Sequence, residues 1–574
     1  MLYNEYFSEE NIVNELIKIR IASARKRHEI EFLNNISSLA PNSVEKIACP
    51  ATKYLPPRRK WKRPRKQFRQ LPNADKTPIC RDKINAAAIR ATIVSAKKNN
   101  NLDQYTWGSN LTTFIQEVRE SITGSIKIEN PEIFLQGKNR EKKTYRPIAV
   151  YRSLKDRIVL SLTARYLREA LDDNMLPCVY AFRSKNSYSY NKAVADLREH
   201  RIKHESQDLY VAECDLQKFF DTVNHRVARQ ALNNAVSKAN TRSKNSIVVD
   251  KKAIEVFEAY LSSYSFSYAQ QEGKKWLQEH NREGVVDWID NKTLKATYGS
   301  LNDDVLGIPQ GGALSPLIAN LVLADADEKV MHPPDPDLFY ARFCDDMIIV
   351  HPDKAQCQAA FDRYINTISA LKVIPHKGVN ITRYGSDVYD YKSKQLYIWG
   401  NPQSGKKIVP WVPFLGYQIK YNGDLRVRPS SIRRQHDKQI KIVSDIIKLI
   451  DEDPESLRDN ADVMRKAQMK LIVMSVGRND HRTKGMTLQP CWADAFYLLE
   501  DNKSCSGQMR ALDHNRERQV RRLKKRLRKI GRLKPGMMDG NSLEYYGAPY
   551  SYHSCIGQEK RREVQIPDNQ LYKL

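Results

Sequence analysis

A pair of adjacent aspartates between two apolar runs constrains the fold of this chain more than any other feature. The stretch FYARFCDDMIIV, residues 339–350, carries Asp345 and Asp346 near its centre. The runs on either side, Leu338–Phe343 and Met347–His351, are rich in aromatic and β-branched residues, which is typical of strands. The pattern therefore predicts a hairpin whose tip holds two carboxylates.

Two carboxylates side by side repel each other and raise each other's pKa unless a cation lies between them. A divalent metal is the usual cation, and hard oxygen ligands suit Mg²⁺. A solvated acidic turn would give the same local pattern. From this stretch alone, the two interpretations are about equally good.

Two motifs upstream favour the metal site. Leu209–Phe220 (LYVAECDLQKFF) is a strand-like run with a carboxylate, Asp215, directly after its apolar part. Gly307–Asn320 (GIPQGGALSPLIAN) is a Gly/Pro turn that opens an apolar helix near Leu314. The order of strand with Asp, Pro-Gln-Gly loop with helix, and Asp-Asp hairpin resembles the palm of a reverse transcriptase. The fold class implied is α+β: a right-hand polymerase with fingers, an antiparallel palm sheet and a helical thumb, preceded by a helical and basic extension.

The resemblance assigns the chemistry to Asp215, Asp345 and Asp346 as catalytic and metal-binding residues. They would hold two Mg²⁺ ions for two-metal nucleotidyl transfer, and the expected enzyme is an RNA-directed DNA polymerase. Family members commonly have Tyr-Ala before the two aspartates, whereas this chain has Phe343 and Cys344. Neither substitution removes a carboxylate, so we expect activity to persist.

The resemblance also predicts a nucleotide-binding set of Arg146, Phe220, Gln310 and Lys377. Arg146 lies in a basic hairpin that could clamp a triphosphate, because the guanidinium group offers forked donors to phosphate. In this family an aromatic at the place of Phe220 excludes a 2′-hydroxyl, Gln310 faces the nucleotide, and a lysine placed like Lys377 lies near the triphosphate. The alternatives are an ordinary basic hairpin, a core phenylalanine and a surface lysine.

The charge of the chain favours a polyanionic partner. Lys and Arg number 95 against 67 Asp and Glu, a formal charge of +28. Pro56–Arg69 interleaves basic residues with Trp61 and Phe68, and residues 516–532 form a basic amphipathic pattern. A solvated linker and a solvated helix are the alternatives. The nucleic-acid-binding residues predicted from these segments and from the loop are Arg58, Arg59, Lys60, Trp61, Gly311, Gly312, Arg521, Arg522 and Lys525.

A chain of 574 residues has room for several domains. Its patterns predict an N-terminal extension over residues 1–100, fingers over 101–205 and a palm over 206–428. A thumb over 429–535 and a tail over 536–574 follow. Within the palm, residues of about 230–300 are interpreted as an insertion, with a polar surface piece at Ser237–Asn245.

Composition narrows the setting. No run approaches the length of a membrane span, and the N-terminus lacks a signal-peptide core. The nine cysteines show no CxxC spacing, so we expect reduced thiols without zinc. The expected location is cytoplasmic, in a bacterium, without a membrane partner.

The motif GxPQGxxLSPxxAN is typical of reverse transcriptases of the group II intron and retron-like lineage. This resemblance favours the hypothesis that the protein acts in antiphage defence together with a structured non-coding RNA. The expected partners are an RNA template, a DNA product and deoxynucleoside triphosphates, with a homo-oligomer or a partner protein also possible. The alternatives are a group II intron-type maturase, which is an RNA-binding splicing protein, and a catalytically idle RNA-binding scaffold.

Overall fold

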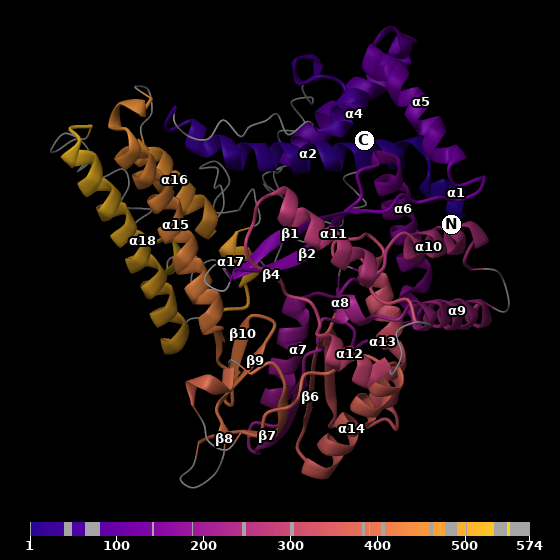
Figure 1. Cartoon of the computed structure of the whole chain (residues 1–574). Coiled ribbons are helices and arrows are strands. Elements are labelled where there is room, and N and C mark those ends of the chain that lie inside the picture. Colours follow the sequence, from indigo (N-terminus) through magenta and orange to yellow (C-terminus); the bar gives the residue numbers. More distant parts are fainter. Residues whose placement is uncertain are drawn as a thin grey trace, which may run out of the picture. The chain divides into compact units, whose positions relative to one another are not determined.

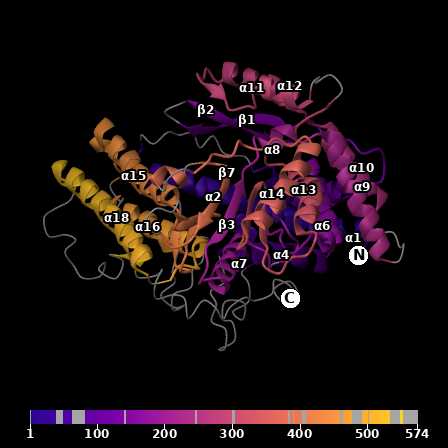
Figure 2. The ribbon, with the colours of Figure 1, turned by 90° about the horizontal axis from the view of Figure 1, so that it is seen from below.

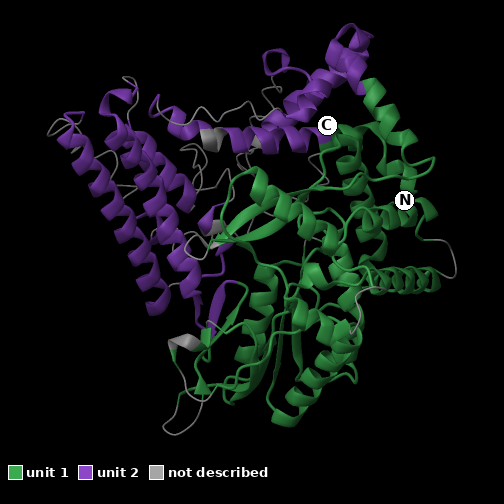
Figure 3. Cartoon of the chain, viewed as in Figure 1, with its two compact units in different colours: residues 1–15, 112–415, 420–423 green, residues 16–111, 416–419, 424–574 purple. Residues whose placement is uncertain are grey.

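The computed structural model divides the chain into two compact units (Figure 3). Unit 1 comprises residues 1–15, 112–415 and 420–423, and unit 2 comprises residues 16–111, 416–419 and 424–574. The structure describes residues 2–38, 49–62, 81–139, 143–185, 187–243, 248–298, 304–381, 385–389, 391–402, 408–458, 463–476, 491–500, 502–532 and 548–551. Phe68 and most of the predicted tail lie outside these residues, as does the end of the basic segment.

Unit 1 is built on a five-stranded sheet in the order β5-β6-β3-β7-β8. The strands are β3 (Leu209–Cys214), β5 (Phe339–Phe343), β6 (Asp346–His351), β7 (Lys394–Trp399) and β8 (Ile408–Val409). All neighbours are antiparallel except β7 and β8. The two predicted runs of the Asp-Asp hairpin are therefore confirmed as β5 and β6. Ile348, Ile349 and Val350 are fully buried, so this strand lies in the centre of the core.

Most of the remaining elements of unit 1 are helices. They are α6 (Leu154–Leu171), α7 (Tyr190–Lys203), α9 (His225–Arg242), α10 (Lys251–Ser262), α13 (Ser315–Met331) and α14 (Lys354–Ala370), with the short α1 (Tyr3–Tyr6), α8 (Phe219–Thr222) and α12 (Asn291–Tyr298). Unit 1 also contains the 3₁₀ turns η4 (Asp172–Asn174) and η5 (Ser386–Tyr389) and the strand β9 (Trp411–Phe414). Helix α14 packs on β3 and β6, and α13 runs beside α14 (Figures 1 and 2). The helix predicted to begin near Leu314 is thus confirmed as α13.

Most of the longer helices of unit 1 begin at a capping residue that the sequence provides. In each case a side-chain oxygen accepts a hydrogen bond from a backbone N–H two or three residues further on, which satisfies a donor without an intrahelical partner. The capping residues are Ser153, Ser189, Asn224, Asp250, Ser265 and Asp353. Local sequence therefore determines where these helices start.

A smaller sheet in unit 1 holds the predicted basic hairpin. Its strands are β1 (Glu132–Asn139), β2 (Thr144–Val150) and β4 (Val285–Val286), in the order β1-β2-β4. Helix α11 (Phe266–Glu279) lies along β1 (Figure 2). Buried Ile133, Leu135 and Ala269 form the core between helix and hairpin.

The segment that the sequence suggested as an insertion is largely helical. The polar piece Ser237–Asn245 continues α9 as far as Arg242, and its last two residues lie outside the described residues. Ala239 is buried against the rest of unit 1, although most of its polar neighbours are exposed. Further along the same segment, Tyr260, Tyr264 and Phe266 are buried.

Unit 2 is mainly helical. Its elements are α2 (Glu9–Asn34, which begins in unit 1), η1 (Pro50–Tyr54), η2 (Arg58–Lys60), α4 (Arg81–Lys98), η3 (Leu102–Gln104), α5 (Thr106–Glu120, which ends in unit 1), β10 (Tyr417–Lys420), β11 (Leu425–Val427), α15 (Pro429–Glu452), η6 (Pro454–Ser456), α16 (Val463–Val476), α17 (Trp492–Ala495) and α18 (Lys503–Lys529). The Asn422-Gly423 pair, which belongs to unit 1, connects β10 to β11, and these two strands pair antiparallel. Gly423 has φ +84° in its turn, a conformation that favours glycine.

The amphipathic stripe predicted on residues 516–532 is the buried side of α18. Leu523 and Leu527 pack with Val443 and Ile446 of α15 and Leu471 of α16 in one apolar cluster. The long helices of residues 430–531 are thus held together by the stripe that the sequence indicated.

Two expectations from composition can be checked on the described residues. All seven cysteines among them are free thiols. Within the same residues, no helix combines the length and hydrophobicity needed to cross a bilayer.

Candidate active site

Strand pairing brings Asp215 next to the Asp-Asp turn. Because β3 and β6 are antiparallel, the last residue of β3, Cys214, faces Met347 near the start of β6. Asp215 follows Cys214, and the turn precedes Met347, so both lie at the same edge of the sheet. The motifs are 130 positions apart in the sequence (345 − 215) and are joined only by this pairing.

The turn itself is tight. Phe343 pairs with Asp346, which leaves Cys344 and Asp345 as the two connecting residues. Cys344 has φ +62°, in the left-handed region that side chains other than glycine rarely occupy. Burial raises the pKa of the Cys344 thiol to about 12, which argues against a nucleophilic or redox cysteine. The Phe343 ring contacts the rings of Phe182 and Tyr190.

The electrostatics of the turn join Asp345 to Asp215. Burial raises the pKa of Asp345, and the neighbouring Asp215 carboxylate raises it further, while the Lys392 ammonium lowers it. Lys392 Nζ lies 2.9 Å from Asp215 Oδ2 and 3.2 Å from His376 Nε2. Asp346 is exposed at the start of β6.

These carboxylates fit a divalent cation. Within the described part of the chain, no group of three or more His, Cys, Asp and Glu side chains converges as a metal site. The close pair is Asp215 and Asp345, and Mg²⁺ commonly binds through one or two carboxylates together with substrate phosphates. A cation between them would favour the charged form of Asp345, which burial and Asp215 disfavour. The three-carboxylate set of the sequence analysis stays a prediction.

The Pro-Gln-Gly loop is anchored to the first motif and to the basic hairpin. The backbone N–H of Ile308 donates to the carbonyl of Phe220 at 2.7 Å, and the N–H of Ala149 donates to the carbonyl of Gln310 at 2.9 Å. At Gly312 a Cβ atom would lie 1.8 Å from the Tyr260 hydroxyl, so only glycine fits there. The loop thus lies between α8 and β2.

A buried carboxyl group contacts the loop. Gln310 Nε2 donates to Asp221 Oδ1 at 3.1 Å, and Asp221 is 1% exposed. Burial raises the pKa of Asp221 to about 7, although Gln310, Lys218 and Arg146 all oppose the rise. Asp221 Oδ2 is buried without a hydrogen-bond partner.

The other predicted nucleotide-binding residues lie around this point. Phe220 is half-buried, whereas its neighbour Phe219 is in the core. Arg146 is exposed on β2, close enough to lower the pKa of Asp221. Lys377 is exposed, two residues after Pro375, which bridges to Leu216. The structure thus brings Phe220, Gln310 and Arg146 together around Asp221.

Two predicted nucleic-acid-binding segments lie in unit 2. Arg58, Arg59 and Lys60 are exposed on η2. The Trp61 indole N–H donates to the carbonyl of Pro56 at 2.8 Å, and the ring lies under the guanidinium group of Arg20.

On α18, Arg521, Arg522 and Lys525 are all exposed. Arg521 pairs with Glu517, and Arg522 Nη1 donates to Ser444 Oγ at 3.0 Å. Of the two glycines predicted in unit 1, Gly311 is exposed and Gly312 is buried.

The groups that hold Asp215 were not predicted from the sequence. Its backbone N–H donates to Ser393 Oγ at 2.9 Å, and its carboxylate contacts Lys392. The His376 backbone N–H donates to the Asp215 carbonyl at 2.8 Å. Lys392 and Ser393 belong to no motif, and pairing of β7 with β3 alone brings them here. His376 directly precedes Lys377 and could have been found from that motif.

The chain is similar to one described protein family. The family model described as "Reverse transcriptase (RNA-dependent DNA polymerase)" matches residues 136–419. This match contains the five-stranded sheet, most of the smaller sheet of unit 1 and all three motifs, and it confirms the α+β, right-hand polymerase fold class expected from the sequence. No curated protein sequence matches the chain.

Among solved structures, the chain has low similarity to yeast telomerases. Apo telomerase from Candida tropicalis, truncated from its C-terminal domain, gives a TM-score of 0.31 at 13% identity, covering 52% of this chain and 55% of that one. Telomerase from Candida albicans in complex with a TWJ fragment of telomeric RNA gives 0.33 at 11% identity, covering 81% and 69%. The chain thus spans about half the length of the first of these proteins.

Proposed function

Because residues 136–419 of the chain form a reverse transcriptase (RNA-dependent DNA polymerase) domain, we propose that the protein as a whole copies an RNA template into DNA. The observation that carries this proposal is the register of β3 against β6, which puts Asp215 beside the turn of Asp345 and Asp346. The substrates would be deoxynucleoside triphosphates and a primer end on the template.

Asp215 and Asp345 would hold two Mg²⁺ ions, with Asp346 in support. When bound, these ions would neutralise the triphosphate and lower the pKa of the primer 3′-hydroxyl group. Around the incoming nucleotide, Arg146 and Lys377 would add positive charge. Phe220 would exclude a ribose 2′-hydroxyl, and Gln310 would face the nucleotide while Asp221 holds its amide group.

The template and the product would be bound by basic surfaces. In unit 2 these are Arg58, Arg59, Lys60 and Trp61, and the exposed face of α18 with Arg521, Arg522 and Lys525. In unit 1, the exposed Gly311 would allow the template to approach the loop backbone closely, and the buried Gly312 would keep the loop packed against Tyr260. The proposal includes the division of the chain into an N-terminal extension, fingers, palm, thumb and C-terminal tail.

For the biological role, we infer a cytoplasmic bacterial enzyme of the group II intron and retron-like lineage that acts in antiphage defence with a structured non-coding RNA. The motif GIPQGGALSPLIAN supports the lineage. Self-association or a partner protein is part of this proposal. A group II intron maturase is the second candidate, favoured by the same motif, and the position of the gene inside or outside intron RNA separates the two.

The proposal is tested on full-length protein purified with its bound RNA. We expect labelled DNA to form when Mg²⁺ and deoxynucleotides are added, and no DNA to form when EDTA replaces Mg²⁺. The variant Asp345→Ala, Asp346→Ala should lose synthesis, because it lacks the carboxylates of the turn. Asp325→Ala, at an exposed aspartate of α13, is the matched control and should retain it.

DNA synthesis by the wild type and by the Asp325→Ala control, but not by the double variant, supports the proposed polymerase activity. The sequence of the product then identifies the template and the primer. Absence of synthesis by the wild type, with RNA tightly bound, would overturn the proposal in favour of a maturase or scaffold. In cells, loss of phage protection in the double variant at unchanged protein level would exclude the scaffold.

A further inference from the structure

A buried ion pair lies directly behind the catalytic turn. Arg342 on β5 is fully buried, and its guanidinium group forms a forked pair with Asp327 of α13. Nε donates to Asp327 Oδ1 at 2.7 Å and Nη2 donates to Oδ2 at 2.6 Å. Tyr340 also donates to Asp327 Oδ1, at 2.7 Å. The carboxylate is thus held by three donors.

The remaining guanidinium nitrogen reaches the turn. Arg342 Nη1 donates to the carbonyl of Cys344 at 3.0 Å and to Asn320 Oδ1 at 3.1 Å. Cys344 is the left-handed residue of the turn, and its carbonyl belongs to the peptide that leads into Asp345. The contact therefore fixes the peptide plane from which the Asp345 side chain projects.

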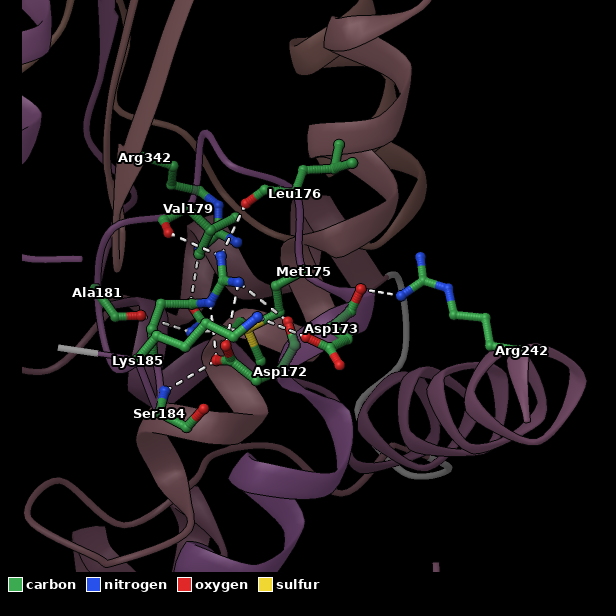
Figure 4. A network of polar contacts seen from close by, with 12 residues as sticks. Asp172, Asp173, Met175, Leu176, Val179, Ala181, Ser184, Lys185, Arg242 and Arg342 are labelled. Carbon is green, nitrogen blue, oxygen red and sulfur yellow. Dashed lines mark hydrogen bonds and ion pairs between the residues drawn. The ribbon is translucent and has the colours of Figure 1, made fainter. Parts of the chain in front are cut away.

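The backbone of Arg342 is held as well. Its N–H donates to the carbonyl of Cys178 at 2.8 Å, and its carbonyl accepts from the N–H of Tyr180 at 2.9 Å. Figure 4 shows Arg342 beside Val179 in this network. With both its backbone and its side chain fixed, Arg342 presents a rigid donor to the turn.

Stability alone is a poor reason for such a pair. Taking two charges out of water costs several kcal/mol, and apolar residues of similar volume often stabilise a protein equally well. The structure also contains a second buried pair of the same kind, Arg183 with Asp172 at 2.8 Å. Arg183 donates to carbonyls of Leu176 and Val179 but to none in the turn. Of these two buried arginines, Arg342 is the one that donates to a residue of the catalytic turn.

We propose that Arg342 is a positioning residue for DNA synthesis, which holds the Cys344 carbonyl and thereby aims Asp345. This inference rests on the proposed function. It predicts that loss of the paired hydrogen bonds between Arg342 and Asp327 slows the chemical step. Nucleotide binding should stay unchanged, because Arg342 is buried behind the turn.

The test compares Arg342→Lys with Arg183→Lys in full-length protein. Both variants keep the positive charge and lose the fork at an equally buried position, so both should lower the thermal midpoint. Synthesis on poly(rA)·oligo(dT) with dTTP is measured per folded molecule. We expect Arg342→Lys to lower kcat by about tenfold to a hundredfold, since small misplacement of a reacting group has effects of this size. Its KM for dTTP should stay within about twofold, and Arg183→Lys should keep kcat within about threefold.

Equal losses of kcat in the two variants, or an unchanged kcat in Arg342→Lys, would overturn the inference. An inactive wild type would instead refute the proposed function itself. If Arg342→Lys does not fold, Asn320→Ala decides, because it removes the other acceptor of Nη1 and leaves the pair with Asp327 intact. A severalfold lower kcat at constant KM supports positioning, and an unchanged kcat contradicts it.

Discussion

Asp221 is a carboxylic acid that the fold keeps out of water. One oxygen accepts from Gln310, and the other is buried without a partner. Lys218 and Arg146 lower the pKa of Asp221, while Asp287 raises it, and burial exceeds these effects. The result is a pKa of about 7, close to physiological pH, next to the predicted nucleotide site.

This residue should make stability depend on pH. The pKa of Asp221 rises from 3.8 to about 7 on folding, so between these values the folded state binds the proton and the unfolded state does not. Stability therefore falls as pH rises through this window, by on the order of 4 kcal/mol at most. Asp221→Asn should remove this part of the slope. Urea unfolding at pH 5 and pH 8 checks it.

The control for this prediction is Asp325→Asn, at an exposed aspartate. It should unfold with the pH dependence of the wild type. An Asp221→Asn protein with the wild-type slope would show that the carboxyl group does not titrate as described.

Among the elements, α18 has one buried apolar face and one exposed basic face. Leu523 and Leu527 bury one side against α15 and α16. The other side exposes Arg521, Arg522 and Lys525. A helix of this kind can bind a nucleic-acid backbone without any change in its own packing.

Replacing Arg521, Arg522 and Lys525 with glutamine should weaken RNA binding and its dependence on salt. Each phosphate contact to a single strand contributes about 0.7 to the slope of log K against log salt, so the slope should fall by about 2. Filter binding to a single-stranded RNA, measured between about 50 and 200 mM KCl, checks this.

The matched variant replaces Lys251, Lys329 and Lys354 with glutamine and so removes the same amount of positive charge. These three lysines are exposed on helices of unit 1. Its slope should equal that of the wild type. Equal slopes for all three proteins would contradict binding by this face of α18.

In the whole molecule, a short segment near the C-terminus contributes to the core of unit 2. Tyr550 is 1% exposed, and its hydroxyl accepts from Gln435 Nε2 at 2.7 Å. Asp513 accepts from the backbone N–H of Tyr550 at 3.0 Å and from that of Ser551 at 2.9 Å. Residues 548–551 are thus bound to α15 and α18, far from them in sequence.

A chain that ends at residue 547 should be less stable than one that ends at residue 551. The shorter chain leaves Gln435 and Asp513 with unsatisfied buried groups, each of which costs about 1–3 kcal/mol. A loss of this size should lower the thermal midpoint by about 5 °C or more. Differential scanning fluorimetry of both truncated chains checks it, and equal midpoints would contradict the role of Tyr550.

The sequence by itself determined the local elements and the identity of the chemistry-bearing groups. The Asp-Asp hairpin, the helix after the Pro-Gln-Gly loop and the stripe of α18 follow from periodicity and turn residues, which act over a few positions. Only the tertiary structure decided which charges meet. Lys392 beside Asp215, Arg342 behind Cys344 and the raised pKa of Asp221 all depend on strand register and on burial. Those quantities arise from groups that are distant in the chain and carry no local signal.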